Sequence, residues 1–184
     1  MSTVGIVCEY NPFHKGHEYQ IQQAKLLTGA EHVICFMSGN FLQRGVPAIA
    51  DKHTRTEIAL RCGVDAVFEI PFVYASSSAR DYAHAAVCMM NALDGIDYIS
   101  FGAECDDMDL LQKIAELTVN EPPQVSEFIK KSVSSGISYG SARAAAISEY
   151  LQNQNLTGYT SADLDRILAS PNNILAIEYI ATLI

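Results

Sequence analysis

Two histidines that flank a glycine near the start of the chain are the residues best suited to do chemistry. They stand in the segment His14-Lys15-Gly16-His17, after an apolar run and the turn formers Asn11 and Pro12. Imidazole N–H groups can donate hydrogen bonds to phosphoryl oxygens as negative charge builds there. A helix beginning here would add unpaired backbone N–H groups, and a glycine lets a ligand approach closely. The pattern favours polyphosphate binding and nucleotidyl transfer.

The same histidines allow two other interpretations. One histidine could simply cap a helix, or the His-x-x-His spacing could present two imidazoles to a metal ion. Zinc would need two further ligands, for which Cys8 and Cys35 are the candidates, and no supporting ligand spacing occurs. We therefore favour the nucleotide and predict no metal ligands among the side chains.

A second candidate region is a long loop predicted over 38–50, since long loops in α/β proteins are often functional. Arg44 could pair with a phosphate or a carboxylate. Lys52 and Arg55 follow in the first turns of a helix, where basic side chains oppose the helix dipole. A bound anion would explain them, and salt bridges to the many acidic residues would explain them equally well. The predicted substrate contacts are Ser38, Gly39, Arg44, Lys52 and Arg55.

Alternating strands and helices must position these residues. Apolar runs predict strands over 3–8, 32–37, 64–70 and 97–101, separated by helices over 17–27, 51–62 and 79–93. Such an order implies a doubly wound parallel sheet with helices on both faces. Ligands of these folds bind outside the carboxyl ends of the strands. His14, Ser38-Gly39 and Gly102 all follow strands and should converge on one edge.

The second half of the chain predicts helices only, over 109–119, 124–134, 141–152 and 171–183, with a polar loop over 153–160. We therefore divide the chain into an α/β nucleotide-binding core, 1–105, and a helical extension, 106–184. Ser170 is the expected N-cap of the last helix, which would leave Asn172 and Asn173 available to a ligand. This last helix is apolar, so we expect a truncated chain whose exposed apolar face favours self-association.

Composition limits the function further. The 184 residues carry a net charge of −9, which argues against a general nucleic-acid binder. The five cysteines form no CxxC pair and are expected to be free, mostly buried thiols of a reducing cytoplasm. No signal peptide or membrane-spanning run is recognisable. The absence of GxxxxGK[ST] and of GxGxxG after the first strand excludes a P-loop enzyme and disfavours dinucleotide binding.

Three blocks of sequence together resemble the bacterial tRNA(Met) cytidine acetate ligase family, within the HxGH nucleotidyltransferase superfamily. They are Glu9 to His17, Met37 to Gly45, and Pro171 to Leu175. The resemblance implies an ATP-dependent ligase that forms acetyl-adenylate and acetylates the wobble cytidine of elongator tRNA(Met). It implies Mg²⁺ with the ATP, and His14 and His17 as catalytic residues. The nucleotide contacts it implies are Val7, Cys8, Glu9, Tyr10, Asn11, Pro12, Phe13, His14, Lys15, Gly16, His17, Glu18, Tyr19, Gln20, Gly102 and Asn172.

The acidic charge conflicts with a tRNA substrate, because phosphate neutralisation supplies most of the affinity for RNA. We therefore expect the tRNA surface to lie largely beyond Ile184. One alternative is a nucleotidyltransferase of small-molecule cofactor metabolism, which the acidic charge favours. Another is a nucleotide-sensing module without turnover, which the intact pair His14 and His17 disfavours.

Overall fold

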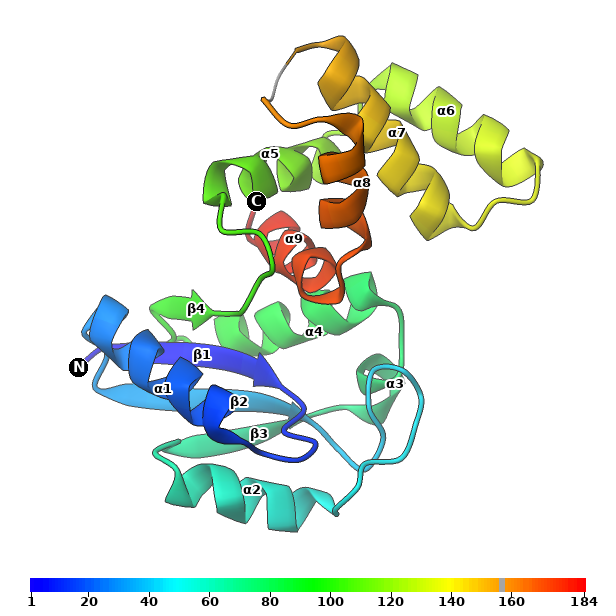
Figure 1. Cartoon of the computed structure of the whole chain (residues 1–184). Helices are drawn as coiled ribbons and strands as arrows, with labels where there is room; N and C mark the ends of the chain where they lie inside the picture. Colours follow the sequence, from blue (N-terminus) through cyan, green and yellow to red (C-terminus); the bar gives the residue numbers. More distant parts are fainter. Residues whose placement is uncertain (156–157) are drawn as a thin grey trace. The chain divides into compact units, whose positions relative to one another are not determined.

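The chain folds into two compact units, Met1–Gly102 and Ala103–Ile184, in a computed structural model that describes residues 1–155 and 158–184 (Figure 1). The first unit contains every strand of the described residues, and the second is helical. The predicted division after residue 105 differs from this boundary by the segment 103–105. Backbone N–H groups of Glu104 and Cys105 bind Asn173, which ties this segment to the second unit.

The first unit is built on a parallel sheet of four strands in the order β3-β2-β1-β4. In the central strand, Gly5 pairs with Ile34 on one side and Ile99 on the other. The chain moves outward from β1 through β2 to β3 and then returns to the opposite side of β1. This reversal confirms the predicted doubly wound fold and places its switch point between β1 and β4. The strands are β1 Thr3–Cys8, β2 His32–Ser38, β3 Ala66–Ile70 and β4 Tyr98–Ser100.

Helices cover both faces of this sheet because alternate residues of β1 point to opposite sides. Val4 and Ile6 join a buried cluster with Ile21 of α1 and Ala59 of α2. On the other face a Cβ added to Gly5 would meet Met90 of α4, so the glycine lets that helix approach closely. The helices of this unit are α1 Lys15–Thr28, α2 Lys52–Arg61, α3 Phe72–Ala75 and α4 Ala79–Ala92.

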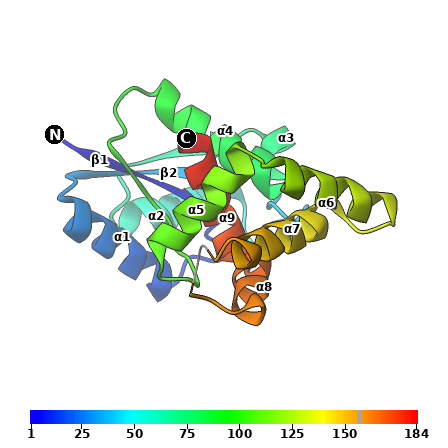
Figure 2. The same cartoon turned by 90° about the horizontal axis from the view of Figure 1, so that it is seen from above.

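The second unit packs its helices in pairs, with α6 beside α7 and α5 beside α9 (Figure 2). Residues of α5, α7, α8 and α9 line a cavity of about 550 Å³ within this unit. The sequence did not predict α8, although Thr160 and Asp163 form a capping box at its start. The helices are α5 Met108–Val119, α6 Pro123–Ser134, α7 Tyr139–Asn153, α8 Ser161–Ala169 and α9 Pro171–Leu183.

Three expectations need correction. The side chain of Ser170 does not cap α9, because its hydroxyl donates to the carbonyl of Arg166. The apolar residues of the last helix are less exposed than expected: Leu183 is exposed, whereas Ile174, Leu175 and Ile180 are half-buried. The cysteines are free, but only Cys8 and Cys35 are buried; Cys62 and Cys105 are half-buried and Cys88 is exposed.

None of the helices within 1–155 and 158–184 is both long and apolar enough to cross a bilayer.

Candidate active site

The two histidines of the HxGH segment form the N-terminus of α1 and stack on each other. Their ring centroids lie 3.6 Å apart with an interplanar angle of 18°. The backbone N–H of Gly16 donates to Nδ1 of His14 at 3.1 Å, and the backbone N–H of His14 donates to Nδ1 of His17 at 3.3 Å. Because Nδ1 of each ring accepts, each neutral imidazole carries its proton on Nε2. Two Nε2–H donors therefore remain for a ligand at this helix end.

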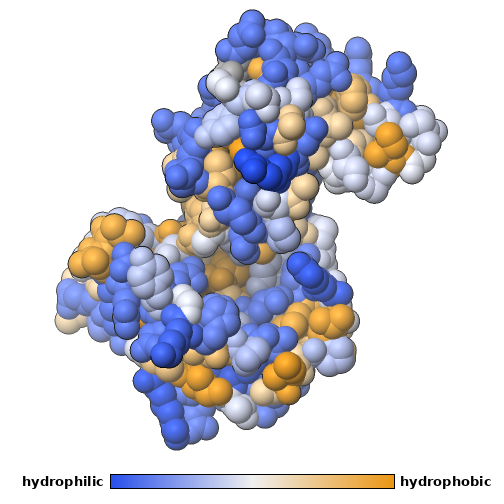
Figure 3. Space-filling view, viewed as in Figure 1, coloured by the Kyte–Doolittle hydropathy of each residue, from blue (hydrophilic) through white to orange (hydrophobic). Residues whose placement is uncertain are grey.

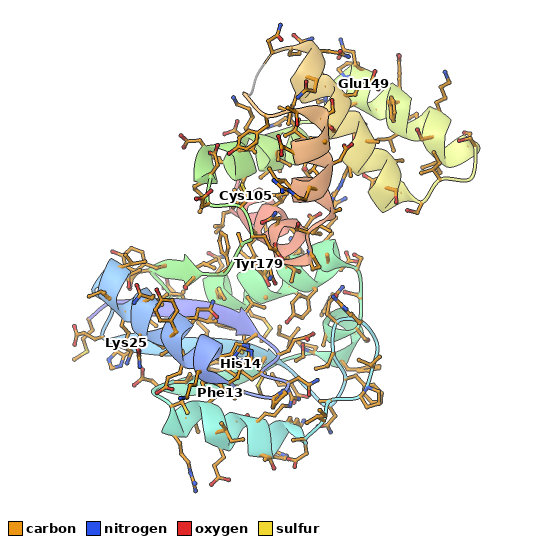
Figure 4. All side chains as sticks on the ribbon, viewed as in Figure 1. Phe13, His14, Lys25, Cys105, Glu149 and Tyr179 are labelled. Atoms are coloured by element: carbon orange, nitrogen blue, oxygen red, sulfur yellow. The ribbon has the colours of Figure 1, made fainter. Side chains whose placement is uncertain are left out.

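Two aromatic rings pack against His17. The His17 ring lies 4.8 Å from Tyr10 and 5.5 Å from Phe13 between centroids. Figure 4 labels Phe13 and His14 near the start of α1. Partial burial, followed by repulsion from His14, lowers the pKa of His17 from 6.5 to about 4. His17 is therefore a neutral hydrogen-bond donor at neutral pH.

Gly16 serves the histidines directly. A Cβ at this position would lie 2.9 Å from Cε1 and 3.0 Å from Nδ1 of His14, closer than side chains pack. Gly16 therefore lets the His14 ring fold over the first turn of α1. The sequence predicted that this glycine leaves space for a ligand. In the structure its missing side chain leaves space for the His14 ring.

The turn before α1 is tied to the long loop after β2. Oε1 of Glu9 accepts the backbone N–H of Gln43 at 2.8 Å, and Oδ1 of Asn11 accepts that of Ile49 at 2.7 Å. Asn11 and Pro12 form the turn itself, as predicted, and the peptide bond between them is cis. The loop is therefore anchored at two points to the residues that carry the histidines.

Arg55 links the strand ends beneath this loop. Its guanidinium donates to the backbone carbonyls of Glu9, Ser38, Gly39 and Ala50, and the side chain is 1 % exposed. No carboxylate of the described residues forms a salt bridge with it. A buried cation thus joins the carboxyl ends of β1 and β2 to the start of α2.

The predicted substrate contacts of this region occupy different settings. Arg44 is exposed in the loop, whereas Lys52 pairs with Glu69 at 2.5 Å. Ser38 is fully buried, with its hydroxyl 3.3 Å from that of Tyr82. Ser38 and Arg55 are thus buried, whereas Arg44 is exposed.

The predicted nucleotide contacts of the first unit lie near the carboxyl ends of the parallel strands. Glu9 to His14 follow the carboxyl end of β1, and Gly102 follows β4, across the switch point. A Cβ added to Gly102 would meet no atom within 4 Å. On α1, Lys15, Glu18 and Tyr19 are exposed, and Gln20 is half-buried. Val7 is half-buried and Cys8 buried in β1.

Asn172 and Asn173 belong to the second unit, where they differ in burial. Asn173 is buried, and its side chain accepts from the N–H groups of Glu104 and Cys105 and donates to Ile167. Asn172 is exposed and donates through Nδ2 to Oε1 of Glu104 at 3.0 Å. Glu104 also accepts both asparagine N–H groups, so it caps α9 in the place expected of Ser170. Only Asn172 is accessible to a ligand.

Within residues 1–155 and 158–184, no three His, Cys, Asp or Glu side chains gather where they could hold a metal ion.

Known proteins with similar sequences fall in one family. A family model described as HIGH Nucleotidyl Transferase matches residues 1–184. A protein of Clostridium perfringens named tRNA(Met) cytidine acetate ligase is 46% identical over 183 residues, which are 100% of this chain and 45% of that protein. A protein of the same name from Halothermothrix orenii is 41% identical over 183 residues, with coverages of 100% and 43%. The chain therefore spans less than half the length of these curated relatives.

A solved structure matches the fold closely. The crystal structure of Thermotoga maritima TmcAL bound with alpha-thio ATP superposes with a TM-score of 0.91 and 38% sequence identity. The match covers 99% of this chain and 43% of that one.

Proposed function

The chain belongs to the HIGH nucleotidyl transferase family, and on that premise we propose that it binds ATP at the N-terminus of α1. We propose further that the whole protein is an ATP-dependent ligase that acetylates the N4 amine of the wobble cytidine of elongator tRNA(Met). The observation that carries the proposal is the pair of Nε2–H donors that His14 and His17 hold at a helix end.

The proposed reaction has two steps. An acetate oxygen attacks the α-phosphorus of ATP, the bond to the bridging oxygen breaks, and pyrophosphate leaves with the electron pair. The cytidine amine then attacks the acetyl carbonyl, loses a proton, and releases AMP. In both steps negative charge builds on oxygens, and preorganised donors stabilise such charge without reorganising. His14 and His17, through Nε2–H, are those donors.

The chain offers no ligand cluster of its own for a divalent ion among its described residues. We therefore propose that Mg²⁺ enters the site bound to the nucleotide.

Relatives support the finer parts of the proposal. The Clostridium and Halothermothrix proteins are named for cytidine, acetate and tRNA(Met), and the Thermotoga protein was crystallised with an ATP analogue. Gly102 at the switch point and Asn172 on α9 remain proposed nucleotide contacts. We also propose that the protein works in the cytoplasm, with which its free cysteines agree.

The test has two stages. ATP binding is measured by calorimetry on this chain, for the parent and for His17→Ala. His53→Ala is the matched control, because His53 is an exposed histidine of α2 outside the site. We expect His17→Ala alone to lose ATP affinity. The full-length protein is then assayed for ATP–pyrophosphate exchange driven by acetate, where His17→Ala should cost about 10²–10³ in rate.

The exchange assay also separates the alternatives. Exchange driven by phosphopantetheine or nicotinamide mononucleotide, and not by acetate, would place the protein in small-molecule cofactor metabolism. ATP binding with no exchange for any acceptor would indicate a nucleotide sensor. ATP binding that is unaffected by His17→Ala would refute the proposed site itself.

A further inference from the structure

Exposed aromatic rings and arginines form a surface at the carboxyl ends of the strands, where the histidines also lie. It comprises Phe41 and Arg44 of the loop after β2, Phe72 and Tyr74 of α3, and Arg80 at the start of α4. Phe41 is 42% exposed and Phe72 59%, yet their rings meet edge-to-face at 5.4 Å between centroids. We call these five residues the loop–α3 surface. Figure 3 shows hydrophobic side chains gathered over this part of the first unit.

The loop–α3 surface is held in a fixed arrangement. Nε2 of Gln43 donates to the carbonyl of Ser77, between α3 and α4, at 3.0 Å. The backbone N–H of the same residue donates to Glu9. Phe41 forms a bridge with Pro47, which closes the loop. One residue, Gln43, therefore connects the surface both to α3 and to the turn that carries His14.

The loop–α3 surface carries two arginines despite the acidic net charge of the chain. Arg44 and Arg80 are exposed and form no salt bridge with any described residue. Glu69, an acidic residue nearby in the sequence, forms a salt bridge with Lys52. Exposed rings beside unpaired guanidinium groups are the combination that binds single-stranded nucleic acid, through stacking on bases and contact with phosphates.

We propose that the loop–α3 surface binds unpaired bases of the RNA substrate next to the nucleotide site. This inference rests on the proposed function for the presence of an RNA substrate, and it names where that RNA touches this chain. Bases stack on Phe41, Phe72 and Tyr74, while Arg44 and Arg80 contact the phosphates. A wobble cytidine lies in a single-stranded anticodon loop, whose neighbouring bases can stack in this way. Part of the RNA surface would then lie within this chain, beside the larger part that the net charge places beyond Ile184.

The experiment uses this chain and a short single-stranded oligoribonucleotide that contains 2-aminopurine, whose fluorescence falls when the base stacks. Titrations are made at low salt, because the acidic chain weakens the binding of RNA as a whole. Phe72→Ala should lower the affinity about tenfold and reduce the quenching. Phe72→Leu should do the same, because it keeps an apolar side chain but removes the ring. Arg44→Gln should lower affinity and reduce the slope of log K against log salt by about one.

Two controls accompany these variants. Leu27→Ala removes an apolar side chain that is 80% exposed at the end of α1, and RNA affinity should not change. ATP affinity should be the same for the parent, Phe72→Ala and Phe72→Leu. Failure of the parent to bind ATP would refute the proposed function without bearing on the quenching.

Several outcomes would overturn the inference. The parent chain could fail to quench the oligonucleotide, or both Phe72 variants could bind it as the parent does. Full RNA affinity in Phe72→Leu with loss in Phe72→Ala would show that apolar contact, and not stacking on the ring, carries the binding. A parent dimer that Phe72→Ala dissociates, with RNA affinity unchanged, would assign the surface to a second copy of the chain.

Discussion

Glu104 and Asn173 bind each other reciprocally, although 69 residues separate them. Oε2 of Glu104 accepts the backbone N–H of Asn173 at 2.8 Å, and Oδ1 of Asn173 accepts the backbone N–H of Glu104 at 2.8 Å. The arrangement caps α9 with a carboxylate, which the positive end of the helix favours. It also holds the first residues of the second unit against its last helix.

Removing the Asn173 side chain should destabilise the second unit. Asn173→Ala leaves the backbone N–H groups of Glu104 and Cys105 without their partner and removes one donor from Ile167, and we expect a loss of about 2–4 kcal/mol in the free energy of unfolding. Asn172→Ala is the matched control, because that side chain is exposed and makes one hydrogen bond. Urea denaturation measures both. Equal losses in the two variants would contradict the structural role given to Asn173.

Gly16→Ala should impair ATP binding without unfolding the chain. The added methyl displaces the His14 ring, while alanine favours a helix over glycine by about 1 kcal/mol. Gly140→Ala is the control: Gly140 occupies the same second position of α7, and a Cβ there meets nothing. We expect ATP affinity to fall only in Gly16→Ala, measured by calorimetry, with the melting temperature preserved in both. Unchanged affinity would show that the His14 ring need not stay where it lies.

The pKa of His17 gives a pH dependence with a definite sign. In the unfolded chain the pKa of His17 is 6.5, whereas in the folded chain it is about 4. This contribution to stability is therefore complete above 6.5 and is lost as the pH falls from 6.5 to 4. Binding of ATP should raise the pKa of His17, because phosphate charge favours the imidazolium. Histidine NMR titration with and without nucleotide tests this, and an ATP-free pKa near 6.5 would contradict it.

Arg55 should stabilise the fold through its hydrogen bonds to backbone carbonyls. Arg55→Met removes the donor of four carbonyls, and we expect a loss of about 2–4 kcal/mol in the free energy of unfolding. Arg55→Lys keeps the charge but lacks the planar fork, so its loss should be intermediate. Arg61→Met is the control, because Arg61 is exposed at the end of the same helix. A fully stable Arg55→Met would show that the strand ends hold without it.

The cysteines should differ in what substitution does to stability. Sγ of buried Cys35 lies 3.3 Å from the hydroxyl of Tyr10, so Cys35→Ser should cost about 1–3 kcal/mol. Exposed Cys88→Ser should stay within about 0.5 kcal/mol of the parent. Thermal denaturation measures both. ATP binding lost in Cys88→Ser would reveal a role that neither sequence nor structure indicates.

The sequence predicted what local patterns encode. The first strand has the predicted bounds, and local signals also mark Asp51 as the cap of α2 and Gly29, in the left-handed conformation, as the end of α1. Each depends on neighbouring residues only. The capping residues and apolar spacing of α8 are local signals too, although this helix was not predicted. By contrast, Glu104 as a helix cap and Arg55 as a buried donor depend on partners distant in the sequence. The edge-to-face contact between Phe41 and Phe72 likewise joins residues that are distant in the sequence.

The two hydrogen bonds that join the HxGH turn to the loop after β2 imply a thermodynamic linkage. Glu9 and Asn11 hold the loop, and the same turn carries the histidines. A ligand that orders either element therefore lowers the entropic cost of ordering the other. Linkage is reciprocal, so ATP must raise the affinity for RNA by the factor by which RNA raises the affinity for ATP. Gln43 and Ile49 would then set the cooperativity between the two substrates without touching the phosphates of either.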